Sequence, residues 1–297
     1  MIRRYLILVL AFALLLSSCV HHTPFENEYY FQALGDSSEL VVTADVNKME
    51  NSSLSEVLPT EGLGKTIVDR ADRVNVCMTP MTLDKYPLDL SDYSISGGIE
   101  GNFGSFTVNT ALSWSKQFHK EKIDDVKFYT DGNLSVAVPK SGLLLFTDAE
   151  YIDLYRKTYS ERVKLIEDEI ANDMASSTAA VFVRTPQTLM NLGFELPDTT
   201  LKQIHTSYFM INEVDDQLLL SGYMIMLDKS GARTMNTILR NQIIQSLKRS
   251  GQKVDVKALA GYFNYDGNVV TISSFPLEGE MKEKALTLIS DSLKGLM

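Results

Sequence analysis

The segment Phe128-Tyr129-Thr130-Asp131-Gly132-Asn133-Leu134 resembles a second segment, Phe263-Asn264-Tyr265-Asp266-Gly267-Asn268-Val269, at a constant offset of 135 residues. In each segment an Asp-Gly pair lies between an aromatic-rich apolar run and a run of alternating polarity. Glycine and asparagine tolerate the positive φ angles that tight hairpin turns require, so this pattern is a strong short-range sign of a β-hairpin. Both segments therefore predict a hairpin that turns at Asp-Gly.

The surroundings of the two hairpins follow the same order along the chain. Each copy starts with a strand candidate and continues with a short helical stretch, a first hairpin, a helix and then the Asp-Gly hairpin. In the first copy these elements are 40–46, 47–57, 93–112 with its turn at Gly101-Asn102, and 114–122. In the second copy they are 179–183, 186–192, 206–227 with its turn near Asp215-Asp216, and 229–249. A further strand is expected at 143–146.

The sequence thus predicts an α+β fold of two diverged β-α-β-β-α-β-β units, with antiparallel sheets that amphipathic helices cover. The first unit, with its trailing helix, spans residues 36–176, and the second, with a C-terminal helix, spans residues 177–297. Only the Asp-Gly-Asn core is identical between the copies. Chance recurrence of hairpin chemistry therefore stays open as the alternative to a duplication.

Three helices carry apolar stripes at steps of three and four residues, namely 149–174, 229–249 and 278–296. Such a stripe is typical of a helix that covers one face of a sheet. A second interpretation makes these helices movable lids over an apolar cavity. Met235 and Leu239, on the stripe of helix 229–249, would then face lipid.

The amino terminus has the three parts of a secretory signal peptide. Arg3 and Arg4 are followed by an apolar run at 5–16 and by Ser17 and Ser18. A positive end, a short apolar middle and small residues before a cleavage point define such a peptide. The apolar run is shorter than the ~20 residues that a membrane-spanning helix requires. Residues 1–18 are therefore predicted to be a signal peptide and are left out of the fold.

The four residues Leu16-Ser17-Ser18-Cys19 resemble the lipobox of bacterial lipoproteins, and the resemblance covers the first nineteen residues. It implies cleavage before Cys19, a diacylglycerol on the Cys19 thiol, and a fatty acid such as palmitate on the new amine. Residues 19–35 would then form a lipidated tether, with contact to the folded body beginning at Tyr29-Tyr30-Phe31. Val20 stands where an aspartate would favour inner-membrane retention in some diderm bacteria, which favours the outer membrane in such an organism. An ordinary signal peptide with a chance cysteine is the alternative.

The amino-acid composition bears on which classes of molecule the protein is expected to bind. Without residues 1–18, 26 basic residues face 38 acidic ones, a net charge of −12. A chain this acidic is not expected to bind nucleic acid, which requires a basic stripe. After modification of Cys19, Cys77 is the one thiol left. It lies in the alternating run 74–78 and is expected to be a small buried hydrophobe in a strand.

No catalytic residue, metal site or cofactor is predicted. The run 62–66 resembles only the end of a phosphate-binding loop, because Pro59 stands where that motif needs its first glycine, and it is expected to start a helix. The glycines between 97 and 104 lead into 106–109, which is expected to continue as a strand. His119 is expected to be solvated, and the four histidines show no metal-ligand spacing. Trp114 is expected to pack under its helix.

These observations favour a lipid-anchored cell-envelope protein without enzymatic activity, acting as a binding or scaffold module. Its partners would be the membrane, through the anchor, and an unidentified envelope protein or lipid. The alternative is a lipid-binding or membrane-inserting carrier that uses its amphipathic helices over an apolar cavity. A hydrolase with carboxylates far apart in the sequence is the third hypothesis.

Overall fold

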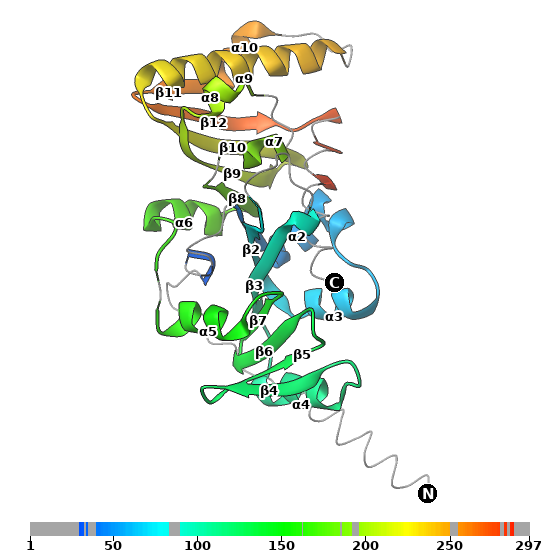
Figure 1. Cartoon of the computed structure of the whole chain (residues 1–297). Helices are drawn as coiled ribbons and strands as arrows, with labels where there is room; N and C mark the ends of the chain where they lie inside the picture. The colour runs from blue at the N-terminus through cyan, green and yellow to red at the C-terminus, as the bar shows by residue number, and fades with distance from the viewer. Residues whose placement is uncertain are drawn as a thin grey trace, which may run out of the picture.

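The computed structural model describes residues 30–32, 34, 40–82, 90–161, 163–184, 186–191, 196–249, 255–279, 282–283 and 286–287 (Figure 1). The strands are β1 Leu40–Asp45, β2 Ala71–Pro80, β3 Tyr93–Gly101, β4 His119–Ile123, β5 Val126–Thr130, β6 Ser135–Lys140, β7 Leu143–Thr147, β8 Ala179–Val183, β9 Ile204–Val214, β10 Gln217–Met226, β11 Phe263–Asp266 and β12 Val269–Pro276. The α-helices are α2 Val46–Glu50, α3 Gly62–Val68, α4 Ser105–Trp114, α5 Tyr151–Tyr159, α6 Asp168–Ser176, α7 Thr188–Asn191, α8 Asp198–Leu201, α9 Lys229–Arg249 and α10 Val256–Tyr262. The 3-10 helices are η1 Tyr30–Gln32, η2 Ser53–Val57 and η3 Leu90–Asp92.

The strands of the described residues form one continuous sheet in the order β11-β12-β10-β9-β8-β1-β2-β3-β7-β6-β5-β4. All neighbouring strands in it are antiparallel, which confirms the predicted α+β class. The halves of the chain meet where β1 pairs with β8, with Val42 opposite Val181. The two halves therefore share a sheet, and the boundary near residue 177 falls between adjacent strands of that sheet.

Both Asp-Gly hairpins are confirmed. Gly132 and Gly267 have φ angles of 97° and 53° at the turns between β5 and β6 and between β11 and β12. The two hairpins occupy different positions, however, because β12 lies directly beside β10 whereas β7 separates β6 from β3. Strand order on the two sides of the β1–β8 pair is otherwise alike for the first strands, β1-β2-β3 and β8-β9-β10. The duplication inferred from the Asp-Gly motif stays a prediction.

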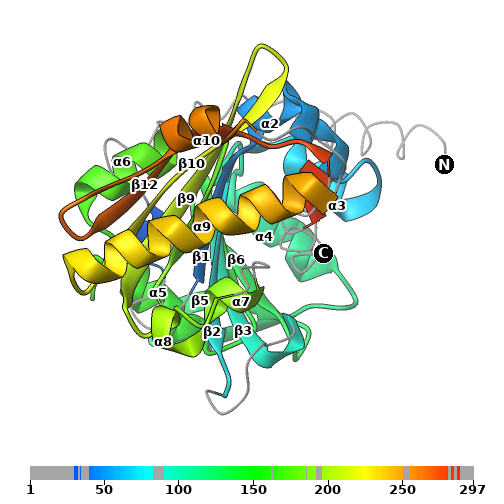
Figure 2. The same ribbon diagram turned by 90° about the horizontal axis from the view of Figure 1, so that it is seen from above.

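Helices cover both faces of the sheet, so the central strands are buried on both sides. In β2, Val74, Val76 and Met78 point to one face, which packs against α2, α9 and the other helices of the larger core. Cys77 points to the opposite face, which is covered by η1, α5 and α6 and is rich in aromatic residues. Figure 1 shows α5 and α6 on one side of the sheet and α2 and α3 on the other, while Figure 2 shows α9 lying across the strands at one end.

The first strand of the predicted hairpin 93–112 is present as β3, but the second strand, expected at 106–109, is wrong because these residues lie in helix α4. Strand β3 ends at Gly101, where a Cβ would lie 2.1 Å from the carbonyl oxygen of Arg70, and the chain leaves the sheet there. The side chain of Asn109 then bonds the backbone of Val138 in both directions, accepting from its amide at 3.1 Å and donating to its carbonyl at 3.0 Å. This contact with β6 is a tertiary one, and it outweighs the local strand preference of Phe106, Thr107 and Val108.

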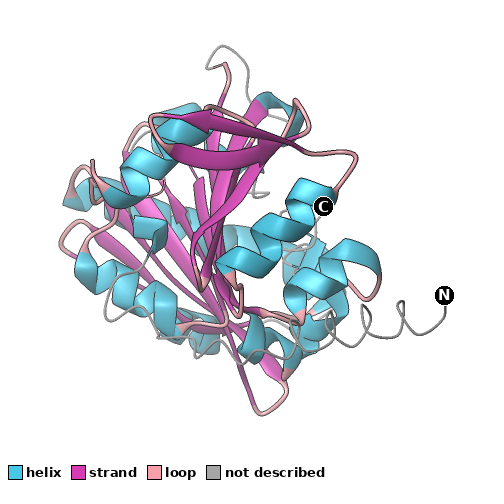
Figure 3. Cartoon of the chain, turned by 90° about the horizontal axis from the view of Figure 1, so that it is seen from below, coloured by secondary structure: helices cyan, strands magenta, loops and turns pink. Residues whose placement is uncertain are grey.

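Two helix predictions are also wrong in part. Residues 119–122, expected in the helix 114–122, lie in β4, which pairs with β5 through a turn with positive φ at Asp124 and Asp125. The single helix expected at 149–174 is two helices, α5 and α6, because the chain between them bonds elsewhere: the Leu165 amide donates to the Gln32 carbonyl at 2.8 Å. Figure 3 shows the helices arranged around the strands. The C-terminal helix predicted at 278–296 lies largely outside the described residues.

Candidate functional sites

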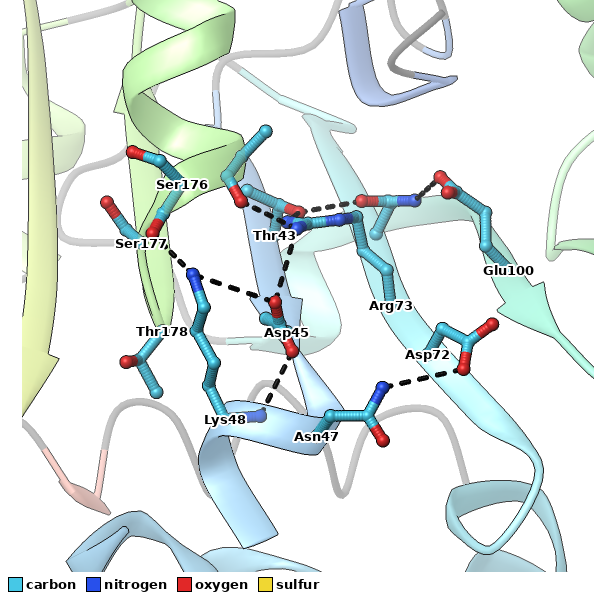
Figure 4. A network of polar contacts seen from close by, with 12 residues as sticks. Thr43, Asp45, Asn47, Lys48, Asp72, Arg73, Glu100, Ser176, Ser177 and Thr178 are labelled. Carbon is cyan, nitrogen blue, oxygen red and sulfur yellow. Dashed lines mark hydrogen bonds and ion pairs between the residues drawn. The ribbon is translucent and has the colours of Figure 1, made fainter. Parts of the chain in front are cut away.

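A polar cluster crosses the middle of the sheet on the face that α6 covers (Figure 4). The alternation of β1, β2 and β3 places these side chains on one face, because Thr43 is opposite Asn75, and Asp45 is opposite Arg73, which in turn is opposite Glu100. Thr43 and Asn75 are fully buried. A polar row at this depth must satisfy its hydrogen bonds internally.

The side chains of the cluster form a continuous series of hydrogen bonds. Arg73 donates to Thr43 Oγ1 at 3.1 Å, Thr43 donates to Asn75 Oδ1 at 2.8 Å, and Asn75 Nδ2 donates to Glu100 Oε1 at 2.9 Å. Burial is the main cause that raises the pKa of Glu100 above its ordinary value, and the bond from Asn75 and the charge of Arg73 oppose that shift. This series of hydrogen bonds begins at the guanidinium of Arg73 and ends at the carboxyl group of Glu100, which burial drives toward its neutral form.

Two cations of this cluster cap the C-terminal end of α6. Arg73 donates to the carbonyl of Ala175 at 2.7 Å, and Lys48 Nζ donates to the carbonyl of Ser176 at 2.5 Å. Asp45 lies 3.7 Å from Arg73 and 3.8 Å from Lys48, and it also caps α2 by accepting from the Lys48 amide. The last carbonyls of a helix have no partner within it and carry partial negative charge, so cations here stabilise it. We interpret the cluster as a clamp between α6 and the sheet.

The residues predicted to face lipid lie in the core. Met235 and Leu239 are buried on the face of α9 that packs against β10, β11 and β12. Exposure to lipid would require α9 to lift from the sheet, and that hypothesis stays a prediction. Cys19 lies outside the described residues. Cys77 is buried in β2, as expected.

A surface feature that the sequence analysis missed is the outer side of α4. This ten-residue helix contains no charged residue, and Phe106 and Trp114 are each 72% exposed on it. The prediction that Trp114 packs beneath its helix is wrong, because Val108 and Leu112 occupy that side. Exposed Lys116, Lys120 and Lys122 follow directly in the chain. The signal available in the sequence was a charge-free run of fifteen residues, 101–115, in an acidic chain.

The described residues also bear on two other kinds of site. They contain no group of three or more His, Cys, Asp or Glu side chains placed to hold a metal ion. No helix among them combines the length and apolar character that a membrane crossing needs. His119 is exposed, as expected, and lies 3.3 Å from Glu121.

Comparison with known proteins finds a shared fold. The chain matches no protein-family model and no curated protein sequence. It is similar to solved structures of TP0453. Crystal form I aligns with a TM-score of 0.60 at 13% identity over 88% of this chain and 96% of that one. Crystal form III aligns with a TM-score of 0.59 at 11% identity over 88% and 97%. At this identity the likeness shows the fold alone.

Proposed function

We propose that the chain is a lipid-anchored protein of the bacterial cell envelope that acts by binding and has no enzymatic activity. The observation that carries the anchor is the sequence at its amino terminus, where a basic pair, a short apolar run and Leu16-Ser17-Ser18-Cys19 follow in the order of a lipoprotein signal. Two or three acyl chains on Cys19 would hold the protein firmly, because a single chain gives only marginal and reversible membrane binding.

The outer side of α4 supports binding as the mode of action. Large apolar side chains that are exposed together mark surfaces for contact with other molecules. Phe106 and Trp114 are eight residues apart, which corresponds to roughly 80° around the helix axis, so both point to the same side. By contrast, Asn75 and Glu100 of the clamp bond to each other, and Arg73 bonds to Thr43 and to α6. The α4 surface is therefore the better candidate for contact with an envelope partner.

The anchor is tested by replacing Cys19 with Ser in the full chain, expressed in a bacterium that lipidates such signals. The unaltered chain is expected to incorporate a radiolabelled fatty acid and to partition with membranes and into detergent. The Cys19→Ser chain is expected to incorporate none. Equal labelling of the two chains would overturn the anchor.

The alternative function, a lipid-binding or membrane-inserting carrier, is favoured by the same helix. An uncharged helix with exposed Phe and Trp, followed by lysines, suits the boundary between lipid headgroups and acyl chains. Trp114 is the single tryptophan of the chain, so its emission reports this surface directly. With vesicles of phosphatidylcholine and phosphatidylglycerol, the carrier hypothesis expects a blue shift of that emission in the Cys19→Ser chain.

The Phe106→Ser variant is expected to weaken such vesicle binding. Val214→Ser is the matched control, since Val214 is an exposed apolar residue at the end of β9, on another part of the sheet. Unchanged Trp114 emission at all lipid concentrations would remove the membrane as the occupant of this surface. The α4 surface would then be left to a protein partner, which crosslinking from position 106 in the native envelope would identify.

A further inference from the structure

The first described residues of the chain pack into the aromatic core as if they were part of it. Tyr30 and Leu34 are buried, and the Phe31 side chain has no exposed surface at all. We call Tyr30, Phe31, Gln32 and Leu34 the strap. It lies across β1, β2 and β3, and Leu34 sits over Gly98, whose missing Cβ would lie 3.7 Å from Leu34 Cδ1.

Gln32 of the strap forms hydrogen bonds with the connection between α5 and α6 and with the first residue of α6. The Gln32 carbonyl accepts from the Leu165 amide at 2.8 Å. The Gln32 side chain donates to the Ile166 carbonyl at 3.1 Å and to Asp168 Oδ1 at 2.8 Å. The strap takes no part in the pairing of the strands beneath it: β1 and β2 pair from Leu40 to Asp45, and β2 and β3 pair along their length. Withdrawal of the strap would therefore break no strand pairing.

The core below the strap contains a thiol whose reactivity can report opening of the strap. Cys77 in β2 is 1% exposed and belongs to the same core cluster as Tyr30, Phe31 and Leu34. Tyr151, in this cluster too, has a buried hydroxyl with no hydrogen-bond partner among the described residues. A buried polar group without a partner is unfavourable, and the cost is relieved where water gains access. If this core opened, water could bond to the Tyr151 hydroxyl, and this gain would lower the free-energy cost of a local opening.

We propose that the strap is a withdrawable closure: it leaves the β1–β2–β3 face as a unit while the sheet stays folded, and it thereby exposes Cys77. The role of this movement rests on the proposed function, because the strap is the last part of the predicted tether, residues 19–35. The position of the lipid anchor would then be coupled to exposure of the face between α5 and α6. Local openings of this kind occur at free energies below that of global unfolding.

The test is the rate at which a soluble thiol reagent labels Cys77 in the full chain carrying Cys19→Ser, which has no other thiol. The rate is measured from zero urea up to the unfolding transition. At low urea it is expected to be nearly independent of urea, because a local opening exposes little surface. A rate that rises from the start with the full urea dependence of global unfolding would overturn the proposal.

Phe31→Ala supplies the second arm. It is expected to raise the labelling rate at zero urea by about tenfold or more, because truncation of a fully buried Phe weakens the closed strap. Phe275→Ala, on the opposite face of the sheet, is the matched control and should leave the urea-independent rate unchanged. Equal acceleration by both variants, in proportion to their loss of global stability, would contradict a separate strap movement. Lipidation plays no part in this measurement, so failure of the anchor and failure of the strap are distinguished.

Discussion

The guanidinium of Arg73 lies 3.7 Å from the carboxylate of Asp45 and donates at the same time to the carbonyl of Ala175 at the C-terminal end of α6. The Arg73 side chain is only 13% exposed. A cation at this depth needs both partners, since either one alone would leave part of its charge uncompensated. One arginine of β2 therefore joins β1 to a helix a hundred residues later in the chain.

Replacement of Arg73 by Met should lower the free energy of unfolding by roughly 2–4 kcal/mol, because the Ala175 carbonyl and Asp45 lose a charged partner in a largely buried site. Urea denaturation measures the loss. Lys65→Met is the control, since the Lys65–Asp69 pair is about half exposed on both sides and contributes little. A loss in Arg73→Met no larger than that in Lys65→Met would show that the clamp adds nothing to stability.

Glu100→Gln should stabilise the protein at neutral pH relative to the unaltered chain. Burial raises the pKa of Glu100, so the folded protein holds this proton more tightly than the unfolded chain. The stability that protonated Glu100 contributes is complete below its ordinary pKa of 4.5 and is lost as the pH rises through the raised value. Glutamine is neutral at every pH and retains the acceptor for Asn75. Denaturation midpoints of the two proteins should therefore converge as the pH falls toward 4.5; a constant difference would contradict this explanation.

Gly97→Ala should destabilise the protein by roughly 1–3 kcal/mol through crowding in the sheet. A Cβ at Gly97 would lie 2.3 Å from the Asn75 carbonyl oxygen and 2.3 Å from Phe146 Cζ, so backbone or ring must move. Gly261→Ala is the paired control in α10, where nothing lies within 4 Å of the added Cβ. That change should stabilise by about 0.5–1 kcal/mol. Thermal denaturation of both variants checks the opposite signs.

Met235→Ala and Leu239→Ala should each lower the free energy of unfolding by about 2–5 kcal/mol, the usual cost of truncating a buried side chain of this size. Thr237→Ala, at an exposed position of the same helix, should change it by less than about 0.5 kcal/mol. If α9 instead acts as a movable lid, the two truncations will cost little stability and will change lipid binding. Urea denaturation and vesicle binding, measured on the same variants, separate the two roles of α9.

Local chemistry was enough to predict several elements. Strand 179–183 and helix 229–249 have the predicted bounds, because apolar strand residues or a sustained helical stripe are unambiguous there. The Asp-Gly turns were predictable because few residues adopt their backbone angles. The burial of Cys77 followed from the alternation around it. None of these depends on a partner far away in the sequence.

The segments that were predicted wrongly depend on partners far away in the sequence. The segment 106–109 has strand-forming residues, yet Asn109 bonds to Val138 across the fold and the segment is helical. The stripe at 149–174 has a continuous helical period, yet Gln32 binds the backbone at Leu165 and Ile166 and the helix breaks. Neither Asn109 nor Gln32 differs in sequence from an ordinary surface amide. Their roles appear only once the sheet brings distant segments together.

Local patterns of residues were sufficient to predict the α+β class, the hairpin turns and the stripe of α9, and a local pattern also makes the amino terminus resemble that of a lipoprotein. The sheet shared by the two halves, the exposure of Trp114 and the capping of α6 by Arg73 and Lys48 became visible only in the folded protein. Pairing between β1 and β8 and the capping of α6 join residues more than a hundred positions apart. Contacts over that separation leave no periodic pattern in the chain, so they follow from the packing of the whole fold.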